Sequence, residues 1–323
     1  MRIVITGAAG FIGSRFAEML LEAQHLGYDD IVILDALTYS GRRENIEGVL
    51  RDSRVSFVQG DITDSEVTEE VLRGAQAVVH LAAESHVDRS ITDARTFFET
   101  NVIGTQTLLE SARRHQVERF VHVSTDEVYG SITEGSWREE HILEPNSPYS
   151  SSKAGSDLAA LAYHRTYGMH VNVTRCSNNY GPRQFPEKVI PLFVTNLMDG
   201  RKVPLYGDGL NVRDWLHVDD HCRGILLVLE GGRAGEIYNI GGGTELTNKE
   251  LTYRLLQLCD KTDASIEPVA DRLGHDRRYS VDCSKIRNEL GYSPQVPFEE
   301  GLAAVVQWYF DNESWWRPLK DAP

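Results

Sequence analysis

Five residues whose side chains can move protons or hold hydroxyl groups lie within one short stretch of the sequence. They are Thr125, Asp126, Glu127, Tyr149 and Lys153. The apolar, β-branched segment FVHVS at 120–124 predicts a buried strand of a parallel sheet. Because ligands bind at the carboxyl ends of the strands in open α/β sheets, the acids that follow this strand are expected at a binding edge.

The segment that starts at Ser147 predicts a helix with Tyr149 and Lys153 on one face. Ser147 suits the N-cap, and Pro148 suits the first helical position. Lys153 then lies about one turn beyond Tyr149. We expect the ammonium, and a nicotinamide cation if one lies nearby, to lower the pKa of the phenol toward neutrality, so that the pair can act as a general base for a hydroxyl. An isolated YxxxK pattern more often belongs to an ordinary surface helix, so this interpretation depends on the acids upstream.

The N-terminal segment has the pattern of a dinucleotide site. A short apolar strand ends at Thr6, and Gly7, Gly10 and Gly13 then begin a segment with helical periodicity. Glycines let the backbone approach a pyrophosphate, which binds the amides at the helix N-terminus. The apolar run IVILD ends at Asp35, about twenty residues further on, where a carboxylate binds the ribose diol of the adenosine. A carboxylate there repels a ribose phosphate, so we expect NAD rather than NADP.

Two further strands predict other walls of the dinucleotide site. The run VSFVQGDI ends at Asp61 and Ile62, which could border the adenine, although Asp61 could equally cap the next helix. The run AVVHLAAES brings the small residues Ala82 and Ala83 close to the cofactor. His86 is interpreted as a loop residue, because a lone histidine without spaced partners is seldom a catalyst.

Composition excludes several classes of function. The formal net charge of -15 over 323 residues argues against nucleic-acid binding, so an anionic substrate needs a local cluster of basic residues. The four cysteines show no CxxC spacing and are expected to be reduced thiols in a cytoplasmic protein. No apolar run reaches the roughly twenty residues of a membrane span, and no export signal is apparent. Asp219 and Asp220 are expected to cap a helix near His221 rather than to bind a metal, and no metal site is predicted.

Segments 97–115 and 149–168 both show helical spacing of apolar residues. If both helices lie on one side of the sheet, their outer apolar positions can pair with the same helices of a second subunit. A homodimer is therefore expected.

On these motifs the chain resembles the extended short-chain dehydrogenase/reductases, and more narrowly the dTDP-glucose 4,6-dehydratases. The broad resemblance is carried by TGAAGFIG, Asp35, HLAAESHVDRS, the Ser124/Thr125 pair and YSSSK. The narrow one is carried by TDEVYG, which has two acids where related sugar-nucleotide epimerases carry small or neutral residues. The match runs to about Trp308.

The fold that this resemblance implies is α/β, with a Rossmann-type doubly wound parallel sheet and a smaller, mostly C-terminal α/β substrate lobe. Residues 1–178 are expected to form the NAD-binding domain, rejoined by about 213–243. Residues 179–212 and 244–323 are expected to form the substrate-binding lobe.

The resemblance also implies two sets of binding residues. Those expected at NAD are Gly7, Gly10, Phe11, Ile12, Gly13, Asp35, Thr38, Asp61, Ile62, Leu81, Ala82, Ala83, Thr100, Ser124, Tyr149, Lys153 and Asn179. Those expected at a nucleotide-diphosphate glucose, dTDP-glucose above all, are Ser85, Thr125, Asn178, Glu187, Lys188, Val189, Pro204, Tyr206, Arg213, Asn248, Arg272, His275 and Asp276. Arg213 suits the diphosphate because its fork binds two phosphate oxygens. Glu187 and Lys188 could instead begin the apolar helix that follows them.

The implied reaction has three stages. Tyr149 takes the C4 hydroxyl proton while hydride passes to NAD, and Thr125 binds the C4 oxygen. Glu127 then removes the C5 proton as Asp126 protonates the departing C6 hydroxyl. Finally the hydride returns to C6 and Glu127 reprotonates C5. Adjacent acids in a desolvated cleft can share one proton, which the resemblance assigns to Asp126.

Other functions stay open at this point. A nucleotide-sugar 4-epimerase or decarboxylase would use the same fold, and a non-catalytic NAD-sensing regulator would use the same cofactor site. Thymine and uracil differ by one methyl, so the base preference is open as well.

Overall fold

A seven-stranded parallel sheet is the largest element of the computed structural model, which describes residues 1–320. Its strand order is β10-β6-β5-β4-β1-β2-β3. The strands are β1 (Arg2–Thr6), β2 (Asp30–Asp35), β3 (Val55–Gln59), β4 (Ala77–His80), β5 (Arg119–Thr125), β6 (Val171–Cys176) and β10 (Ile237–Ile240). The chain runs outward from β1 to β3 and then returns to β4 on the other side of β1. The predicted doubly wound Rossmann-type sheet is thus confirmed, with its switch point between β1 and β4.

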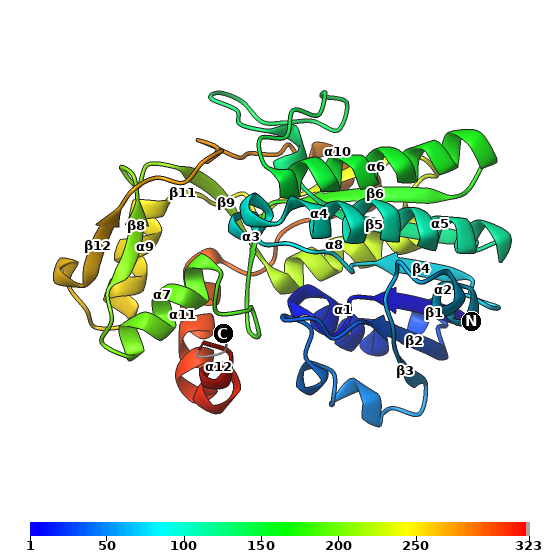
Figure 1. The fold of residues 1–323 in the computed structure, drawn as a ribbon, viewed down its shortest axis with the longest axis horizontal. Helices are drawn as coiled ribbons and strands as arrows, with labels where there is room; N and C mark the ends of the chain where they lie inside the picture. The colour runs from blue at the N-terminus through cyan, green and yellow to red at the C-terminus, as the bar shows by residue number, and fades with distance from the viewer. Residues whose placement is uncertain (321–323) are drawn as a thin grey trace.

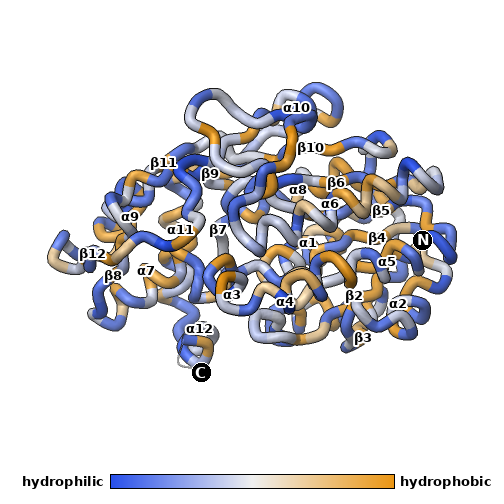
Figure 2. Tube along the Cα trace, turned by 45° about the horizontal axis from the view of Figure 1, so that its top comes forward, coloured by the Kyte–Doolittle hydropathy of each residue, from blue (hydrophilic) through white to orange (hydrophobic). Residues whose placement is uncertain are grey.

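Helices cover both faces of this sheet (Figure 1). One face is covered by α1 (Phe11–Glu22), α8 (Val218–Gly231) and α10 (Ser284–Leu290), and the other by α2 (Ser65–Val71), α5 (Thr105–Arg114) and α6 (Pro148–Tyr167). Successive side chains of β1 point to opposite faces of the sheet. Ile3 packs with Phe16 of α1 on one face, and Val4 belongs to the same cluster as Leu161 of α6 on the other. Figure 2 shows the resulting concentration of hydrophobic segments along the central strands and the helices beside them.

A short helical connection joins β4 to α5. It consists of α3 (Val87–Thr92), α4 (Ala94–Phe98) and η4 (Glu99–Gly104), the last of which is a π-helix. Asn101 in the π-helix hydrogen-bonds both backbone groups of Glu84, through Oδ1 at 2.9 Å and Nδ2 at 3.0 Å, and donates to Ser152 Oγ at 2.8 Å. This residue therefore fixes the loop after β4 against α6.

A second group of elements lies beside the carboxyl edge of the sheet (Figure 1). A three-stranded sheet has the order β11-β9-β7, and a two-stranded sheet pairs β12 with β8. The elements are β7 (Asn178–Tyr180), α7 (Val189–Met198), β8 (Val203–Tyr206), β9 (Val212–His217), β11 (Glu245–Thr247), α9 (Asn248–Leu258), β12 (Ile266–Val269), α11 (Phe298–Asp311) and α12 (Glu313–Lys320). They share a core that contains Phe193, Leu251 and Leu302.

The remaining helical elements of the described residues are short 3-10 helices. They are η1 (Gln24–Leu26), η2 (Arg43–Asn45), η3 (Val49–Arg51), η5 (Asp126–Tyr129) and η6 (Asp263–Ser265). The lobe boundaries expected near residues 178, 213 and 243 stay a prediction. In the strand pairing, β9 joins β7 and β11, while β10 joins β6 in the large sheet.

The start of α6 is as predicted from the sequence. Ser147 Oγ accepts from Ser150 N at 3.1 Å, Ser147 N donates to Ser150 Oγ at 3.0 Å, and Pro148 occupies the first turn. This capping box satisfies helix-terminal amides and fixes where Tyr149 enters the fold.

The predicted caps of α8 are wrong. His217 caps this helix by accepting from Asp219 N at 3.2 Å. Asp219 instead pairs with Arg15 at 2.8 Å, and Asp220 accepts from the backbone amides of residues 295 and 296. The arginine and the amides are supplied by distant parts of the chain, so the local pattern gave no sign of them. At α2 the cap is Asp64, not Asp61.

Gly13→Ala should destabilise the protein, because an added Cβ would lie 2.2 Å from the Gly7 carbonyl oxygen and 2.7 Å from Ala8 Cα. We expect a loss of about 1–3 kcal/mol from this overpacking, measured as a lower midpoint of urea unfolding. Gly48→Ala is the matched control, since a Cβ there meets nothing within 4 Å. Equal midpoints for the two variants would show that the close approach of α1 to the turn is not required.

Candidate active site

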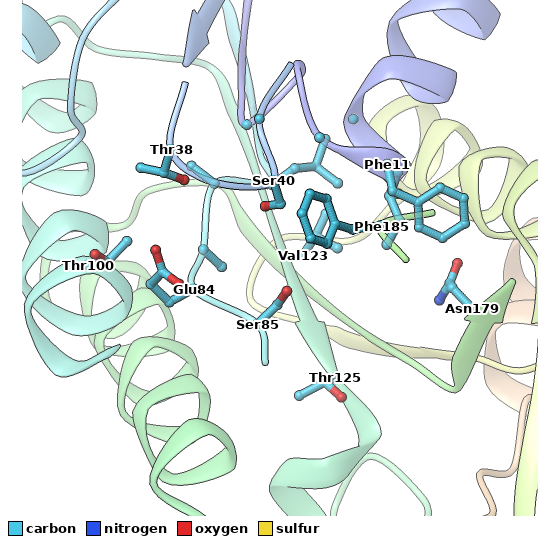
Figure 3. Close-up of a pocket in the computed structure, with 18 of the residues that line it drawn as sticks. Phe11, Thr38, Ser40, Glu84, Ser85, Thr100, Val123, Thr125, Asn179 and Phe185 are labelled. Atoms are coloured by element: carbon cyan, nitrogen blue, oxygen red, sulfur yellow. The ribbon is translucent and has the colours of Figure 1, made fainter. Parts of the chain in front are cut away.

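A cleft opens at the carboxyl ends of the central strands and extends toward the second group of elements. Every residue predicted for catalysis and for NAD lines it, as do five of the predicted substrate residues: Ser85, Thr125, Asn178, Glu187 and Lys188. Figure 3 shows side chains reaching this cleft from separate parts of the chain, among them Phe11, Ser85, Thr125 and Phe185. The roles assigned to these residues stay predictions, but the structure brings them together.

The turn between β1 and α1 forms the floor of the cleft. Gly7 has φ +71°, and a Cβ on it would lie 2.6 Å from the backbone nitrogen of Ala82. Only glycine permits both the left-handed backbone and this approach to the chain after β4. Gly7, Gly10 and Gly13 line the cleft beside the N-terminus of α1, whose free backbone amides suit a pyrophosphate.

Asp35 lies at the end of β2 with both carboxylate oxygens oriented by the backbone. Oδ2 accepts from Ala9 N at 2.8 Å, and Oδ1 accepts from Leu37 N at 2.8 Å. Burial raises the pKa of Asp35 even though these two amides act in the opposite direction. Each oxygen keeps a free lone-pair direction, so the carboxylate can still bind a diol.

The two adjacent acids lie in η5, directly after β5. Asp126 is only 2% exposed, and burial, the Glu127 charge and the Asp214 charge raise its pKa well above the usual value. Burial also raises the pKa of Glu127, but Arg272, Arg213 and Lys188 oppose this shift. The stronger upward effect thus falls on Asp126, which favours a neutral Asp126 beside a charged Glu127.

Tyr149 and Lys153 are both buried on the face of α6 that meets β5. Lys153 Nζ donates to the Val123 carbonyl oxygen at 2.8 Å, and burial lowers the pKa of the ammonium to about 8. Burial and the Glu127 charge raise the pKa of Tyr149 well above its usual value, although a hydrogen bond with Thr125 lowers it. The protein's own groups therefore do not bring this pKa toward neutrality, because desolvation and the neighbouring acid raise it, and the part of the prediction that depends on a nicotinamide cation stays a prediction.

Basic residues of the second group of elements surround Glu127. Arg213 on β9 is 5% exposed, stacks 4.3 Å from the centre of the Tyr279 ring and donates to the Asp276 carbonyl oxygen at 2.9 Å. Arg272 lies 3.4 Å from Asp88. These arginines form the cationic side of the site that the sequence predicted for an anionic substrate.

The other predicted substrate residues do not line this cleft, although Arg213 and Arg272 act on the charge of Glu127. Within the described residues, the lining of the cleft does not include Val189, Pro204, Tyr206, Arg213, Asn248, Arg272, His275 or Asp276. Tyr206 on β8 and His275 contact each other edge to face, with ring centres 6.4 Å apart. Asn248 is the first residue of α9 and Val189 the first of α7.

Glu187 bridges the two sides of the cleft instead of capping α7. Tyr39 donates its hydroxyl hydrogen to Glu187 Oε1 at 2.9 Å, and Arg89 Nε donates to Oε2 at 3.2 Å. The Arg89 guanidinium also stacks 3.8 Å from the centre of the Tyr39 ring. Lys188 Nζ donates to the Ser85 carbonyl oxygen at 2.6 Å. Lys188 is the N-cap residue of α7, as the sequence allowed, but its side chain makes no capping hydrogen bond, because partners from the first group of elements occupy the side chains of both Glu187 and Lys188.

Sequence reasoning missed part of the lining. The missed residues are Leu34, Ala36, Ser40, Gly41, Gly60, Glu84, Val123, Cys176, Ser177, Arg183, Gln184 and Phe185. Half of them directly precede or follow a residue that was predicted, so extending each predicted segment by one position would have found those. The segment 183–185 is different, since it crosses the cleft only because Arg183 binds Glu18 and the Asn45 carbonyl oxygen, each at 2.8 Å.

Comparison with known proteins agrees with this geometry. Residues 4–305 match the family model described as GDP-mannose 4,6 dehydratase. A relative from Streptomyces antibioticus named dTDP-glucose 4,6-dehydratase is 60% identical over 100% of this chain and 96% of its own length. The chain belongs to the dTDP-glucose 4,6-dehydratase family. NAD is the cofactor of this family member, as predicted, and relatives were solved with NAD bound.

Solved structures separate this family from its neighbours. DesIV, a dTDP-glucose 4,6-dehydratase from Streptomyces venezuelae solved with NAD and TYD bound, has a TM-score of 0.97 at 62% identity, covering 99% of this chain and 100% of its own. The UDP-glucose 4-epimerase of Thermus thermophilus, solved with NAD, has a TM-score of 0.88 at 33% identity, covering 97% and 100%. The dehydratase is thus far closer in sequence than the epimerase.

The described residues contain no helix long and apolar enough to cross a membrane. Within the same residues, no group of three or more His, Cys, Asp or Glu side chains is placed to hold a metal ion.

Asp35→Asn should weaken NAD binding about tenfold or more, because a charged acceptor of the ribose diol is replaced by a neutral one. The affinity for NADP should fall less, since the repulsion of a ribose phosphate is removed. Titration of cofactor-stripped protein, followed by nucleotide fluorescence, measures both. Asp30→Asn, at the exposed start of the same strand, is the control and should change neither affinity. Unchanged NAD affinity in Asp35→Asn would exclude a ribose contact.

Proposed function

We propose that this protein removes water from dTDP-glucose and forms dTDP-4-keto-6-deoxyglucose, with NAD as a tightly held cofactor. The observation that carries the proposal is the placement of Asp126, Glu127 and Tyr149 on one wall of the dinucleotide cleft. The relatives named dTDP-glucose 4,6-dehydratase support the same reaction. Sugar-nucleotide epimerases of this fold do not need such an acid pair, because their reaction eliminates no hydroxyl group.

The residues present fit NAD. The glycines of the turn after β1 line the cleft where the pyrophosphate would bind, the oriented Asp35 carboxylate suits the ribose diol, and the same cleft is lined by Tyr149. When bound, NAD accepts the hydride from C4 and later returns it to C6. A cofactor that is regenerated within each cycle has no need to leave, which agrees with a cleft bridged by Glu187.

Tyr149 is the proposed base for the C4 hydroxyl. Since burial and Glu127 raise the pKa of this phenol, it is protonated unless positive charge stands beside it. Lys153 supplies part of that charge, and the oxidised nicotinamide ring supplies the rest. Thr125, which lines the cleft with Tyr149 and lowers the pKa of that phenol, is proposed to hold the C4 oxygen as its proton leaves.

The acid pair carries the elimination. Glu127 is the proposed base at C5, because Arg272, Arg213 and Lys188 favour its charged form. Asp126 is the proposed acid for the C6 hydroxyl, because burial beside two other carboxyl groups keeps it protonated. The arginines on the far side of Glu127 are proposed to bind the diphosphate of the substrate.

We also propose a homodimer. Large apolar side chains are exposed on the outer face of α4, η4 and α6, namely Phe98 (42%), Ile103 (54%), Leu158 (55%) and Tyr167 (54%). Solvent-exposed apolar side chains gathered on one face are typical of an interface. A cytoplasmic location is proposed on the cysteine pattern alone.

Glu127→Gln should still permit C4 oxidation but not C5 deprotonation. Reduced cofactor should therefore accumulate when dTDP-glucose is added, while the loss of one water, followed by mass spectrometry, should fall at least about a hundredfold. Tyr149→Phe is the contrasting variant and should block reduction of the cofactor as well. If neither variant changes the absorbance of the cofactor and turnover stays near normal, the assigned roles are refuted.

Product analysis separates the dehydratase from its alternatives. Wild-type protein incubated with dTDP-glucose should give a product lighter by one water, with a methyl group at C6. An isomer of the substrate would identify an epimerase, released carbon dioxide a decarboxylase, and no turnover with any nucleotide sugar an NAD-sensing regulator.

Leu158→Asp should convert the dimer into a monomer, because a carboxylate on the outer face of α6 would face its own copy across a two-fold axis. Sedimentation at micromolar concentration measures the change. Tyr253→Asp, at an exposed position of α9 in the second group of elements, is the control and should leave the dimer intact. A wild-type monomer at these concentrations would contradict the homodimer.

A further inference from the structure

A second charged residue of α6 lies beneath the Tyr149–Lys153 pair and has no part in the proposed reaction. Asp157 follows Lys153 by four residues, so both project from the same face of the helix. Its side chain has 0% exposure, and Arg175 Nε on β6 donates to its Oδ2 at 2.9 Å. The arginine is itself only 2% exposed. Burying this ion pair costs desolvation free energy that two hydrophobic side chains would not cost. The pair therefore suggests a role for the Asp157 charge next to the proposed catalytic lysine.

Titratable and charged groups face Lys153 from each element that packs around it. They are His80 on β4, His122 on β5, Cys176 on β6 and Asp157 on α6 itself, while Arg175 on β6 contacts Asp157 and Tyr149 lies one turn before Lys153 on α6. Burial and the Lys153 charge lower the pKa of His122 to about 4, and burial lowers that of His80, so both rings are neutral. Burial raises the pKa of the Cys176 thiol to about 12. Among these groups, Asp157 alone carries a negative charge.

Contacts hold Asp157 in its charged form. Burial by itself would raise the pKa of the carboxyl, but Arg175 and His122 outweigh burial and lower it. His122 Nε2 lies 3.4 Å from Asp157 Oδ1. The arginine is held in turn by the Tyr129 ring, whose centre lies 4.6 Å from the guanidinium carbon. A fixed carboxylate therefore persists one helical turn below the lysine.

Lys153 needs such a charge. Burial lowers the pKa of its ammonium to about 8, and Asp157 is the leading group that opposes this shift. The hydrogen bond from Nζ to the Val123 carbonyl oxygen orients the ammonium but adds no negative charge. Without a nearby anion, the ammonium would lose its proton close to neutral pH.

We propose that Asp157 is a positioning residue for the proposed base, and that its carboxylate, fixed by Arg175, keeps the Lys153 side chain protonated. The proposal rests on the assigned role of Tyr149 and Lys153 in removing the C4 hydroxyl proton. Asp157 does not line the cleft, so it acts on the reaction only through Lys153.

The test is the pH profile of kcat/KM for the NAD-loaded protein with dTDP-glucose. Asp157→Asn keeps an acceptor for Arg175 and loses the charge, so the alkaline limb of the profile should move to lower pH by about one unit. Arg175→Gln removes the cation that holds Asp157 in its charged form while keeping a donor for it, so the limb should also move to lower pH, by a smaller amount. KM at low pH should stay near the wild-type value in both variants.

Asp220→Asn is the control for loss of a buried carboxylate, because Asp220 is 1% exposed on α8. It should lower the Tm and leave the limb in place. An unmoved limb in folded Asp157→Asn overturns the proposal. If that variant does not fold, Arg175→Gln serves as the test. A limb that is unmoved or moves to higher pH in Arg175→Gln then overturns the proposal.

The observations that would refute the proposed function are different from those that would refute the role of Asp157. A wild-type protein that releases no water from dTDP-glucose, or a Tyr149→Phe variant with full activity, would refute the assigned reaction irrespective of any shift in the profile.

Discussion

Two adjacent carboxyl groups share a desolvated site at the end of β5, and they cannot both ionise there at low cost. Asp126 is the more deeply buried and faces both Glu127 and Asp214, whereas Glu127 faces three cations. The asymmetry of the surroundings therefore separates two chemically similar residues into an acid and a base. An elimination needs both at once, and an unsymmetrical environment provides them without a change of pH.

Both parts of the fold are needed to create that asymmetry. The large parallel sheet supplies the acids, the tyrosine and lysine of α6, and the glycine turn with Asp35 for the dinucleotide. The second group of elements supplies Lys188, Arg213 and Arg272, which stabilise the charge of Glu127. Glu187 ties the two parts together by hydrogen bonds to Tyr39 and Arg89. The site is thus complete only when the two parts meet over the cleft.

Features that depend on neighbouring residues were predictable from the sequence. The β5 strand, the capping box at Ser147 and the glycine turn each follow from a local pattern, and the cleft contains all the residues predicted for catalysis and NAD. Features that depend on distant partners were not. Glu187 and Asp219 bind residues more than a hundred positions away, and the pKa of Tyr149 is set by desolvation and Glu127, which the spacing of Tyr149 and Lys153 does not reveal.

The division of one proton between the two acids is the central claim, and infrared spectroscopy of the protein at neutral pH tests it most directly. A neutral carboxylic acid has a carbonyl stretching band that a carboxylate lacks. The account predicts that this band is present in the wild type, is reduced in Asp126→Asn and persists in Glu127→Gln. A band that is unaffected by Asp126→Asn, or is reduced only by Glu127→Gln, would contradict it.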